Sequence, residues 1–150
     1  MEITTEKIKE LRETTGVSVM QCKRALEEAG GDPAKAASIL KKHSTVSALK
    51  KVARVLSAGI VGSYTHDGNI GALVALSCET DFVAKNPEFG ELARSLAMQV
   101  AAMDPESTEH LLEQPFIKDE RMVVRNLLDE ATQKFGERIE LSRFARLSVR

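Results

Sequence analysis

The 150-residue sequence contains no tryptophan and a single tyrosine, and aromatic residues make up only 4% of it. It also lacks an excess of charge, because 21 lysines and arginines face 22 acidic residues, for a net charge of −1. Proteins that bind nucleic acid or anionic lipid usually carry a positive field, and those that bind single strands add aromatic platforms for bases. We therefore expect no direct nucleic-acid partner and no membrane partner.

Cysteine and histidine are scarce as well. Cys22 and Cys78 are far apart and form no paired motif, which indicates a reduced, cytoplasmic protein with both thiols buried. His43, His66 and His110 lack ligand spacing with either cysteine, so we expect no metal and no cofactor. A Cys–His nucleophile would depend on proximity in the fold, but Cys22 lies on the apolar stripe of a predicted helix, which favours a structural thiol.

Long apolar runs and phosphate-binding loops are missing too. No run reaches the length of a membrane span, and residues 1–4 do not have the character of a signal peptide. Gly59 and Gly62 precede a predicted strand, whereas a phosphate-binding loop opens a helix. Glu79 and Asp81 resemble a carboxylate pair, but nothing else in the sequence suggests a substrate pocket. We expect no catalytic residues and no enzymatic activity.

The residues that are present predict a globular protein, with 43% hydrophobic and 29% charged residues. Residues 1–42 show three short helical patterns, with Thr4, Ser18 and Asp32 as N-caps and Gly16 as a stop. This region is predicted to be a compact three-helix module, and it resembles ubiquitin-associated-like domains. Lys41-Lys42-His43 is interpreted as its exit and as a hinge, followed by a connecting helix over residues 43–57.

A change of period follows. Residues 59–65 and 70–78 flank an Asp67-Gly68 turn, which predicts a β-hairpin. The second strand has almost no polar alternation, so we expect both of its faces to be covered. Asn86-Pro87 begins a helix that ends at Asp104-Pro105.

The remaining elements complete an α+β core over residues 58–150, with an antiparallel sheet packed on helices. Residues 111–116 are predicted to form a strand, and Asp119 is predicted to cap a helix that closes at Gly136. Residues 139–149 alternate between apolar and polar side chains, which predicts a final strand with one buried face. The apolar face of this strand, with Leu141, Ala145 and Leu147, together with an uncovered sheet edge, suggests a homodimer.

The connection at residues 80–86 does not follow from any folding rule. It joins the hairpin to the next helix, where rigid scaffolds often carry function, and it places Phe82 beside Asp81. Composition alone leaves two interpretations of Phe82 open. It either folds inward over the core or lies exposed as a contact.

Several segments carry a family resemblance. Residues 78–86, Cys-Glu-Thr-Asp-Phe-Val-Ala-Lys-Asn, resemble the central signature of elongation factor Ts, the nucleotide-exchange factor for elongation factor Tu. The helix wording at residues 8–12 and 20–26 is similar to the start of that family. The Leu-Glu-Gln-Pro-Phe stretch at 112–116 and the Arg-Phe-Ala-Arg ending at 143–146 are similar to its later parts. The resemblance therefore covers nearly the whole chain.

The resemblance implies a function and a set of contact residues. It implies that the protein binds elongation factor Tu with GDP and promotes GDP release by disturbing the Mg²⁺ and phosphate-binding site. The residues that the resemblance assigns to nucleotide release are Thr80, Asp81, Phe82 and Val83. In the N-terminal module it assigns the contact residues Leu11, Arg12, Val19 and Met20, with Val19 standing where the family has a methionine.

The sequence also departs from the family. The long helical insertion before the Gln-Pro-Phe strand is missing, and so is a second half-core, which suggests a short, single-core form. Gln99 stands where the family often has a histidine. The alternative function is a protein-interaction adaptor built on the ubiquitin-associated-like module, without exchange activity. An RNA-binding role is disfavoured by charge and by the lack of aromatics.

Overall fold

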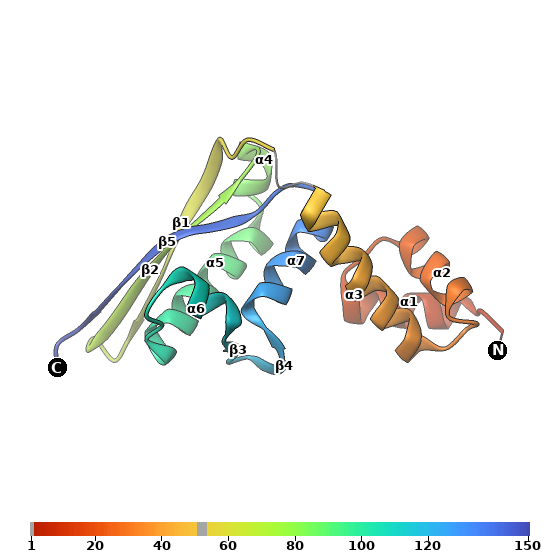
Figure 1. Ribbon diagram of the computed structural model, residues 1–150, viewed down its shortest axis with the longest axis horizontal. Coiled ribbons are helices and arrows are strands. Elements are labelled where there is room, and N and C mark those ends of the chain that lie inside the picture. The colour runs from red at the N-terminus through yellow and green to blue at the C-terminus, as the bar shows by residue number, and fades with distance from the viewer. Residues whose placement is uncertain (1, 51–53) are drawn as a thin grey trace. The chain divides into compact units, whose positions relative to one another are not determined.

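The computed structural model describes residues 2–50 and 54–150. The chain forms two compact units. The first unit comprises residues 1–52 and 129–136, and the second comprises residues 53–128 and 137–150. Figure 1 labels the helices and strands, and the fold is of the α+β class, as predicted.

Three helices make up most of the first unit: α1 (Thr5–Thr15), α2 (Val19–Glu28) and α3 (Pro33–Lys50). The predicted caps are confirmed. The Thr4 hydroxyl accepts from the N–H of Lys7 at 3.3 Å, and the Ser18 hydroxyl accepts from the N–H of Gln21 at 3.3 Å. Gly16, with φ of 70°, ends α1 in the left-handed conformation that glycine tolerates best. These local signals explain why the helices begin and end where the sequence predicted.

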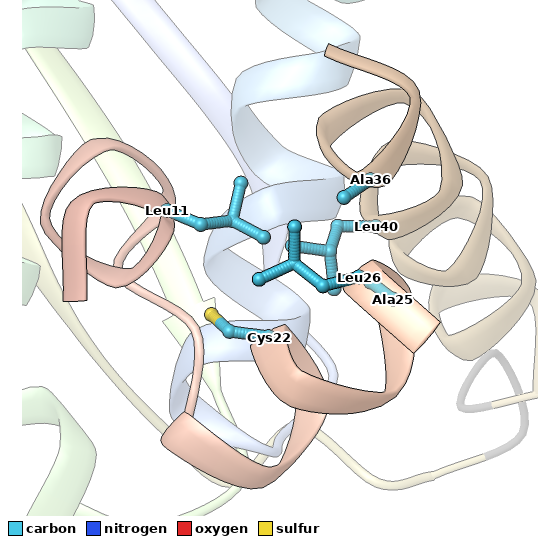
Figure 2. Close-up of a cluster of buried hydrophobic side chains, with 6 residues drawn as sticks. All are labelled: Leu11, Cys22, Ala25, Leu26, Ala36 and Leu40. Carbon is cyan, nitrogen blue, oxygen red and sulfur yellow. The ribbon is translucent and has the colours of Figure 1, made fainter. Parts of the chain in front are cut away.

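Small and medium apolar side chains form the core of this unit. Figure 2 shows the cluster, which consists of Leu11, Cys22, Ala25, Leu26, Ala36 and Leu40. All six are at most 4% exposed. The three alanine and cysteine positions on α2 and α3 leave room for close helix packing, consistent with a ubiquitin-associated-like module.

The predicted hinge at residues 41–43 is wrong as a break in the helix. Helix α3 continues unbroken from Pro33 to Lys50, because no proline or glycine interrupts this stretch. Ser44 does not cap a new helix; its hydroxyl donates back to the carbonyl of Leu40 at 3.1 Å. Of the predicted connecting helix at residues 43–57, residues 43–50 are part of α3, residues 51–53 lie outside the described residues, and residues 54–57 are not helical.

The second unit is organised on a three-stranded antiparallel sheet of order β1-β2-β5 (Figure 1). Its strands are β1 (Ala58–His66), β2 (Ile70–Cys78) and β5 (Glu140–Ser148). The hairpin prediction is confirmed. Asp67 and Gly68 both have positive φ, of 51° and 67°, and the N–H of Asn69 bonds to the carbonyl of His66 at 3.0 Å. This is the backbone pattern that suits the twist of a tight hairpin.

Helix α5 (Pro87–Met103) covers the inner face of the sheet. The side chains that β2 buries there are Ala72, Val74, Leu76 and Cys78. Strand β1 approaches the helix very closely at Gly62, where an added Cβ atom would lie 2.5 Å from the carbonyl carbon of Ala93. Glycine is therefore required at this crossing by packing and not by backbone conformation.

The outer face of the sheet is uncovered within the second unit, so the prediction that both faces of β2 are covered is wrong. Val61, Leu73 and Leu147 are 65%, 51% and 80% exposed. The prediction that β5 keeps one buried face is also wrong. Leu141 is buried, but the register shifts so that Ala75 pairs with Arg143 and Leu76 with Leu141. Ser142 falls between these two pairs as an extra residue in β5. It reverses the alternation of buried and exposed side chains, so Leu147 points to the exposed face.

The segment between α5 and β5 also differs from the prediction. Residues 108–113 form helix α6 (Thr108–Glu113), capped by the Ser107 hydroxyl, and only β3 (Pro115–Phe116) is extended. Asp119 does not cap a helix. It begins strand β4 (Asp119–Val123), and its carboxylate binds the backbone N–H and guanidinium of Arg121. Helix α7 (Val124–Phe135) starts later and ends at Gly136 as predicted.

Gln99 holds this segment to α5. Its side chain is 0% exposed, and all its polar atoms are bonded. The amide nitrogen donates to Gln114 Oε1 at 3.2 Å and to the carbonyl of Pro115 at 3.0 Å, while the amide oxygen accepts from the N–H of Ile117 at 2.9 Å. A buried amide with satisfied donors and acceptors fixes one arrangement of its neighbours. In this chain, Gln99 is thus a structural residue.

Candidate functional site

The stretch between β2 and α5 forms a single helical turn, α4 (Asp81–Ala84). Thr80 caps it, with its hydroxyl accepting from the N–H of Val83 at 3.3 Å. The N–H of Lys85 bonds to the carbonyl of Asp81 at 3.0 Å, which closes the turn. Asn86 then caps α5 through the N–H of Glu88 at 2.9 Å. Two consecutive caps therefore define the backbone of this stretch on both sides.

Phe82 lies on the outer side of the turn. It is 85% exposed, and Asp81 beside it is exposed as well. Val83 and Ala84 point the other way and are 5% and 8% exposed. Successive helical residues turn by about 100°, so a four-residue turn can bury one pair and expose the other. The inward interpretation of Phe82 is wrong: the turn is anchored by its neighbours and presents the phenyl ring to solvent.

An exposed phenylalanine forgoes a sizeable gain. Fully burying such a side chain is worth roughly 1.5–3 kcal/mol, and Phe82 contributes almost none of this to the fold. Phe89, seven positions later on α5, is 0% exposed and shows the ordinary use of this residue in the same unit. The position of Phe82 is therefore suited to a contact outside the chain.

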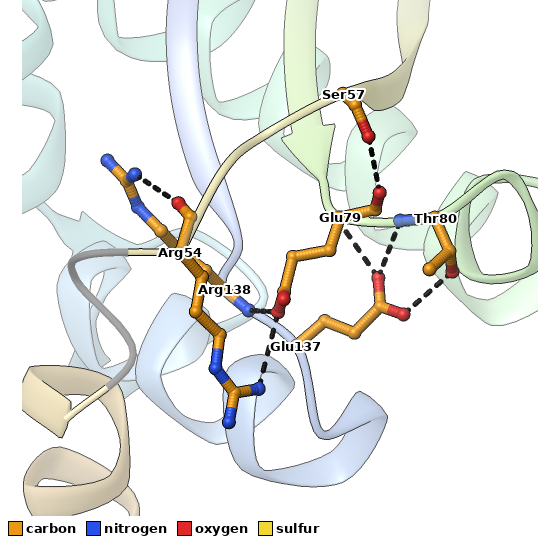
Figure 3. A network of polar contacts seen from close by, with 6 residues as sticks. All are labelled: Arg54, Ser57, Glu79, Thr80, Glu137 and Arg138. Carbon is orange, nitrogen blue, oxygen red and sulfur yellow. Dashed lines mark hydrogen bonds and ion pairs between the residues drawn. The ribbon is translucent and has the colours of Figure 1, made fainter.

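A carboxylate holds the backbone in front of the turn (Figure 3). Glu137 Oε1 accepts from the N–H groups of Glu79 and Thr80, at 3.1 and 3.0 Å. Its other oxygen accepts from the Thr80 hydroxyl at 2.7 Å. Sequence reasoning missed Glu137, because it lies 57 residues from Thr80 and no local pattern links the two.

Glu79 in turn binds the segment that carries Glu137. Its carboxylate accepts from the N–H of Arg138 at 2.5 Å and lies 3.6 Å from the Arg54 guanidinium. Its carbonyl accepts from the Ser57 hydroxyl at 2.7 Å. Glu79 is thus committed to this network, whereas Asp81 faces solvent.

Cys78 lies directly beneath the network. Its thiol donates to the carbonyl of Thr80 at 3.3 Å. Burial, reinforced by the negative charge of Glu137, raises the pKa of the Cys78 thiol above its ordinary value. A buried thiol with a raised pKa is a poor nucleophile, so Cys78 has a structural role here.

The predicted N-terminal residues all lie in the first unit. Leu11 is 4% exposed and belongs to the helical core, so it supports the surface without forming it. Arg12 is exposed near the end of α1. Val19 and Met20 are 50% and 59% exposed on the first turn of α2. Arg12, Val19 and Met20 therefore provide the exposed part of this set.

Within residues 2–50 and 54–150, no group of three or more His, Cys, Asp or Glu side chains is placed to hold a metal ion. No helix in the described part of the chain is both long and apolar enough to cross a membrane.

Comparison with known proteins gives consistent matches. A sequence model of the family described as elongation factor TS matches residues 79–150. Elongation factor Ts of Thermodesulfovibrio yellowstonii is 37% identical over 193 positions, which cover 99% of this chain and 97% of that protein. Elongation factor Ts of Carboxydothermus hydrogenoformans is 39% identical over 193 positions, covering 98% and 89%.

The lengths of these alignments also carry information. Both extend over 193 positions, more than the 150 residues of this chain, so both relatives contain residues without a counterpart here. Elongation factor Ts of Clostridium kluyveri is 41% identical over 148 positions, which cover 98% of this chain but 48% of that longer protein. The Thr80–Asn86 turn, the sheet that presents it and the N-terminal helices all lie within these matched regions, and the chain belongs to the elongation factor Ts family.

Proposed function

We propose that this protein is a guanine-nucleotide exchange factor of translation elongation. It binds elongation factor Tu in the GDP-bound and nucleotide-free forms and promotes the release of GDP, so that GTP can enter. It forms no covalent intermediate and is not an enzyme in the chemical sense. The observation that carries the proposal is the 85% exposure of Phe82 on a turn that is capped on both sides.

The chemistry of the turn suits this role. Phe82 would enter an apolar gap beside the nucleotide site of the partner, where its burial becomes favourable. Asp81 would bring a carboxylate toward the Mg²⁺ and the phosphates. A carboxylate repels phosphate at short range, and its oxygen is a ligand that Mg²⁺ accepts. Both effects weaken the hold on GDP.

The free energy from burying Phe82 is smaller than the barrier lowering that fast exchange requires. A ten-thousand-fold faster release needs about 5.5 kcal/mol of barrier lowering, at 1.36 kcal/mol per tenfold change. Burial of Phe82 supplies at most roughly 3 kcal/mol of that. Other contacts must therefore hold the factor on its partner while the turn acts. By linkage, a factor that weakens GDP binding is itself bound less tightly by the GDP form.

We infer that the N-terminal unit provides part of this binding. Arg12, Val19 and Met20 are exposed, and methionine suits adaptable apolar contacts. The test is Met20→Asp, a change at a 59% exposed position that should leave the melting temperature within about 2 °C. It is expected to raise the half-saturating concentration of the factor and leave the rate at saturation unchanged.

We also propose that the protein forms a homodimer through the outer face of its sheet. Val61, Leu73 and Leu147 form an exposed apolar row on three adjacent strands, and a two-fold pairing would cover it on both copies. Two copies would also match the length of the Clostridium kluyveri protein, of which this chain covers 48%. Leu141, which the sequence placed on this face, is buried on the inner side. A monomeric mass at micromolar concentration would contradict the dimer.

The near-neutral charge and the two reduced cysteines support a cytoplasmic protein that does not bind nucleic acid directly. The central experiment measures the loss of labelled GDP from purified elongation factor Tu with increasing amounts of this protein. Exchange activity predicts a rate that rises to saturation. An adaptor would bind without changing the rate, and that result would refute the proposal.

A further inference from the structure

The turn at residues 80–84 gains support from one carboxylate that the proposed mechanism does not use. We propose that Glu137 is a positioning residue for the exchange turn: it fixes the backbone and the cap from which Asp81 and Phe82 project. This inference rests on the proposed exchange function. Glu137 itself makes no contact with the partner in the proposed mechanism.

The position of Glu137 follows from where the sheet ladder ends. The pairing of β2 with β5 stops at Ser77 and Glu140. Beyond that point, the N–H groups of Glu79 and Thr80 lie outside the ladder. Glu137 Oε1 accepts hydrogen bonds from both N–H groups, at 3.1 and 3.0 Å. A side chain thus takes the place of the strand partner that these N–H groups lack. Hydrogen bonds to a charged acceptor are stronger than those between neutral groups.

The second oxygen of Glu137 determines the direction of the cap. The Thr80 hydroxyl has one proton, and it donates this proton to Glu137 at 2.7 Å. Its lone pair is then free to accept from the N–H of Val83 at 3.3 Å. Since Val83 is the anchor next to Phe82, the orientation of the phenyl ring depends on this chain of two hydrogen bonds.

The contact is reciprocal, which restricts sliding of one segment against the other. Glu79 accepts from the N–H of Arg138, the residue after Glu137, at 2.5 Å (Figure 3). The carboxylates of Glu79 and Glu137 thus each accept hydrogen bonds from the backbone of the other segment. Misplacing a reacting group by about 1 Å can cost on the order of a hundredfold in rate. A fixed turn is therefore important if Phe82 must enter a gap beside the nucleotide site of the partner.

The test compares Glu137→Ala with Glu140→Ala. Glu140 is a glutamate that binds Arg138 at 2.7 Å, and among the described residues it makes no hydrogen bond or ion pair with the turn, so it is the matched control. Melting curves establish that both variants fold, and GDP release is measured across a range of factor concentrations. We expect Glu137→Ala to lower the rate at saturation by about tenfold, with the half-saturating concentration changed less than threefold. Glu140→Ala should stay within twofold on both.

Further variants distinguish positioning from general support. Glu137→Gln keeps an oxygen for the two backbone N–H groups and should recover most of the rate. Thr80→Val removes the hydroxyl and should slow release, whereas Thr80→Ser keeps the hydroxyl and should recover most of the rate. The double change Thr80→Val with Glu137→Ala should be no slower than the slower single variant, because both remove the same chain of contacts. If Glu137→Ala does not fold, the two Thr80 variants decide the question.

Each outcome has a defined meaning. If the unmodified protein does not accelerate GDP release, the proposed function fails and the positioning role fails with it. If the unmodified protein accelerates release and Glu137→Ala does so equally, only the positioning role fails. A loss that appears solely as a raised half-saturating concentration, or a double variant with additive losses, would also overturn it.

Discussion

Phe82 and Phe89 provide a direct test of how the second unit uses its aromatic residues. They lie seven positions apart and are 85% and 0% exposed. A buried phenylalanine changed to alanine typically costs 3–5 kcal/mol, whereas a change at an exposed position stays within about 0.5 kcal/mol. For a chain of this size, 1 kcal/mol corresponds to roughly 2–4 °C in melting temperature. Phe89→Ala should therefore lower the melting temperature on the order of 10 °C, and Phe82→Ala by less than about 2 °C.

The effects on exchange should run in the opposite direction. If Phe82 becomes buried in the partner, its loss removes roughly 1.5–3 kcal/mol, which corresponds to about a ten- to hundredfold slower release at saturation. Phe89→Ala should keep its activity per folded molecule below its own melting temperature. The assay is labelled GDP release at saturating factor, with the folded fraction measured by circular dichroism. The reasoning fails if Phe82→Ala melts like Phe89→Ala, or if it releases GDP at the normal rate.

Three further substitutions and one thiol-labelling experiment test separate parts of the structure. Asp81→Ala should slow GDP release severalfold without a change in melting temperature, and a normal rate would show that its carboxylate is not used. Gly62→Ala should destabilise the fold by several kcal/mol, because its Cβ atom would lie 2.5 Å from the backbone of Ala93 on the packed helix; a neutral result in a urea titration would contradict this crossing. Gln99→Met should cost roughly 1–3 kcal/mol in the same titration, since it leaves the buried Gln114 side chain and two part-buried backbone groups without their partner. The raised pKa of Cys78 favours the neutral thiol in the fold, so this group stabilises the protein below the ordinary thiol pKa, and the contribution is lost as the pH rises through the raised value. Ellman's reagent at pH 8 should therefore label Cys78 only as fast as the protein opens.

The features that the sequence predicted correctly are those with a local cause. Thr4, Ser18 and Asn86 each cap a helix through a backbone N–H two or three residues ahead, so the signal and the structure lie within one turn. The Asp67-Gly68 turn is equally local. The exposure of Phe82, in contrast, was left open by the sequence, because four residues do not show which side of a turn faces the core.

The features that the sequence missed have distant or competing causes. The apolar residues that follow Ser107 fit a strand as well as a helix. In the structure the Ser107 hydroxyl accepts from the N–H of His110 and caps helix α6. The inserted residue in β5 reverses the buried face after Leu141, and no alternation pattern can show where a register shift falls. Helix α3 runs from Pro33 to Lys50 without a break at the predicted hinge, since no proline or glycine interrupts it there. A truncation after residue 42 would therefore cut a helix in its interior and would not isolate a module.

The exposure of Phe82 has a structural requirement of its own. A large apolar side chain on a mobile loop would collapse onto the nearest apolar surface, and the outer sheet face of this protein offers one. The turn at residues 81–84 prevents this in two ways. Val83 and Ala84 are buried and fix its inner side, and the Thr80 cap with Glu137 fixes the backbone that enters it. The free energy that holds Phe82 outward therefore comes from its buried and capping neighbours and not from the phenyl ring itself. It follows that exchange activity can be lost through Val83 or Glu137 while Asp81 and Phe82 are both still present.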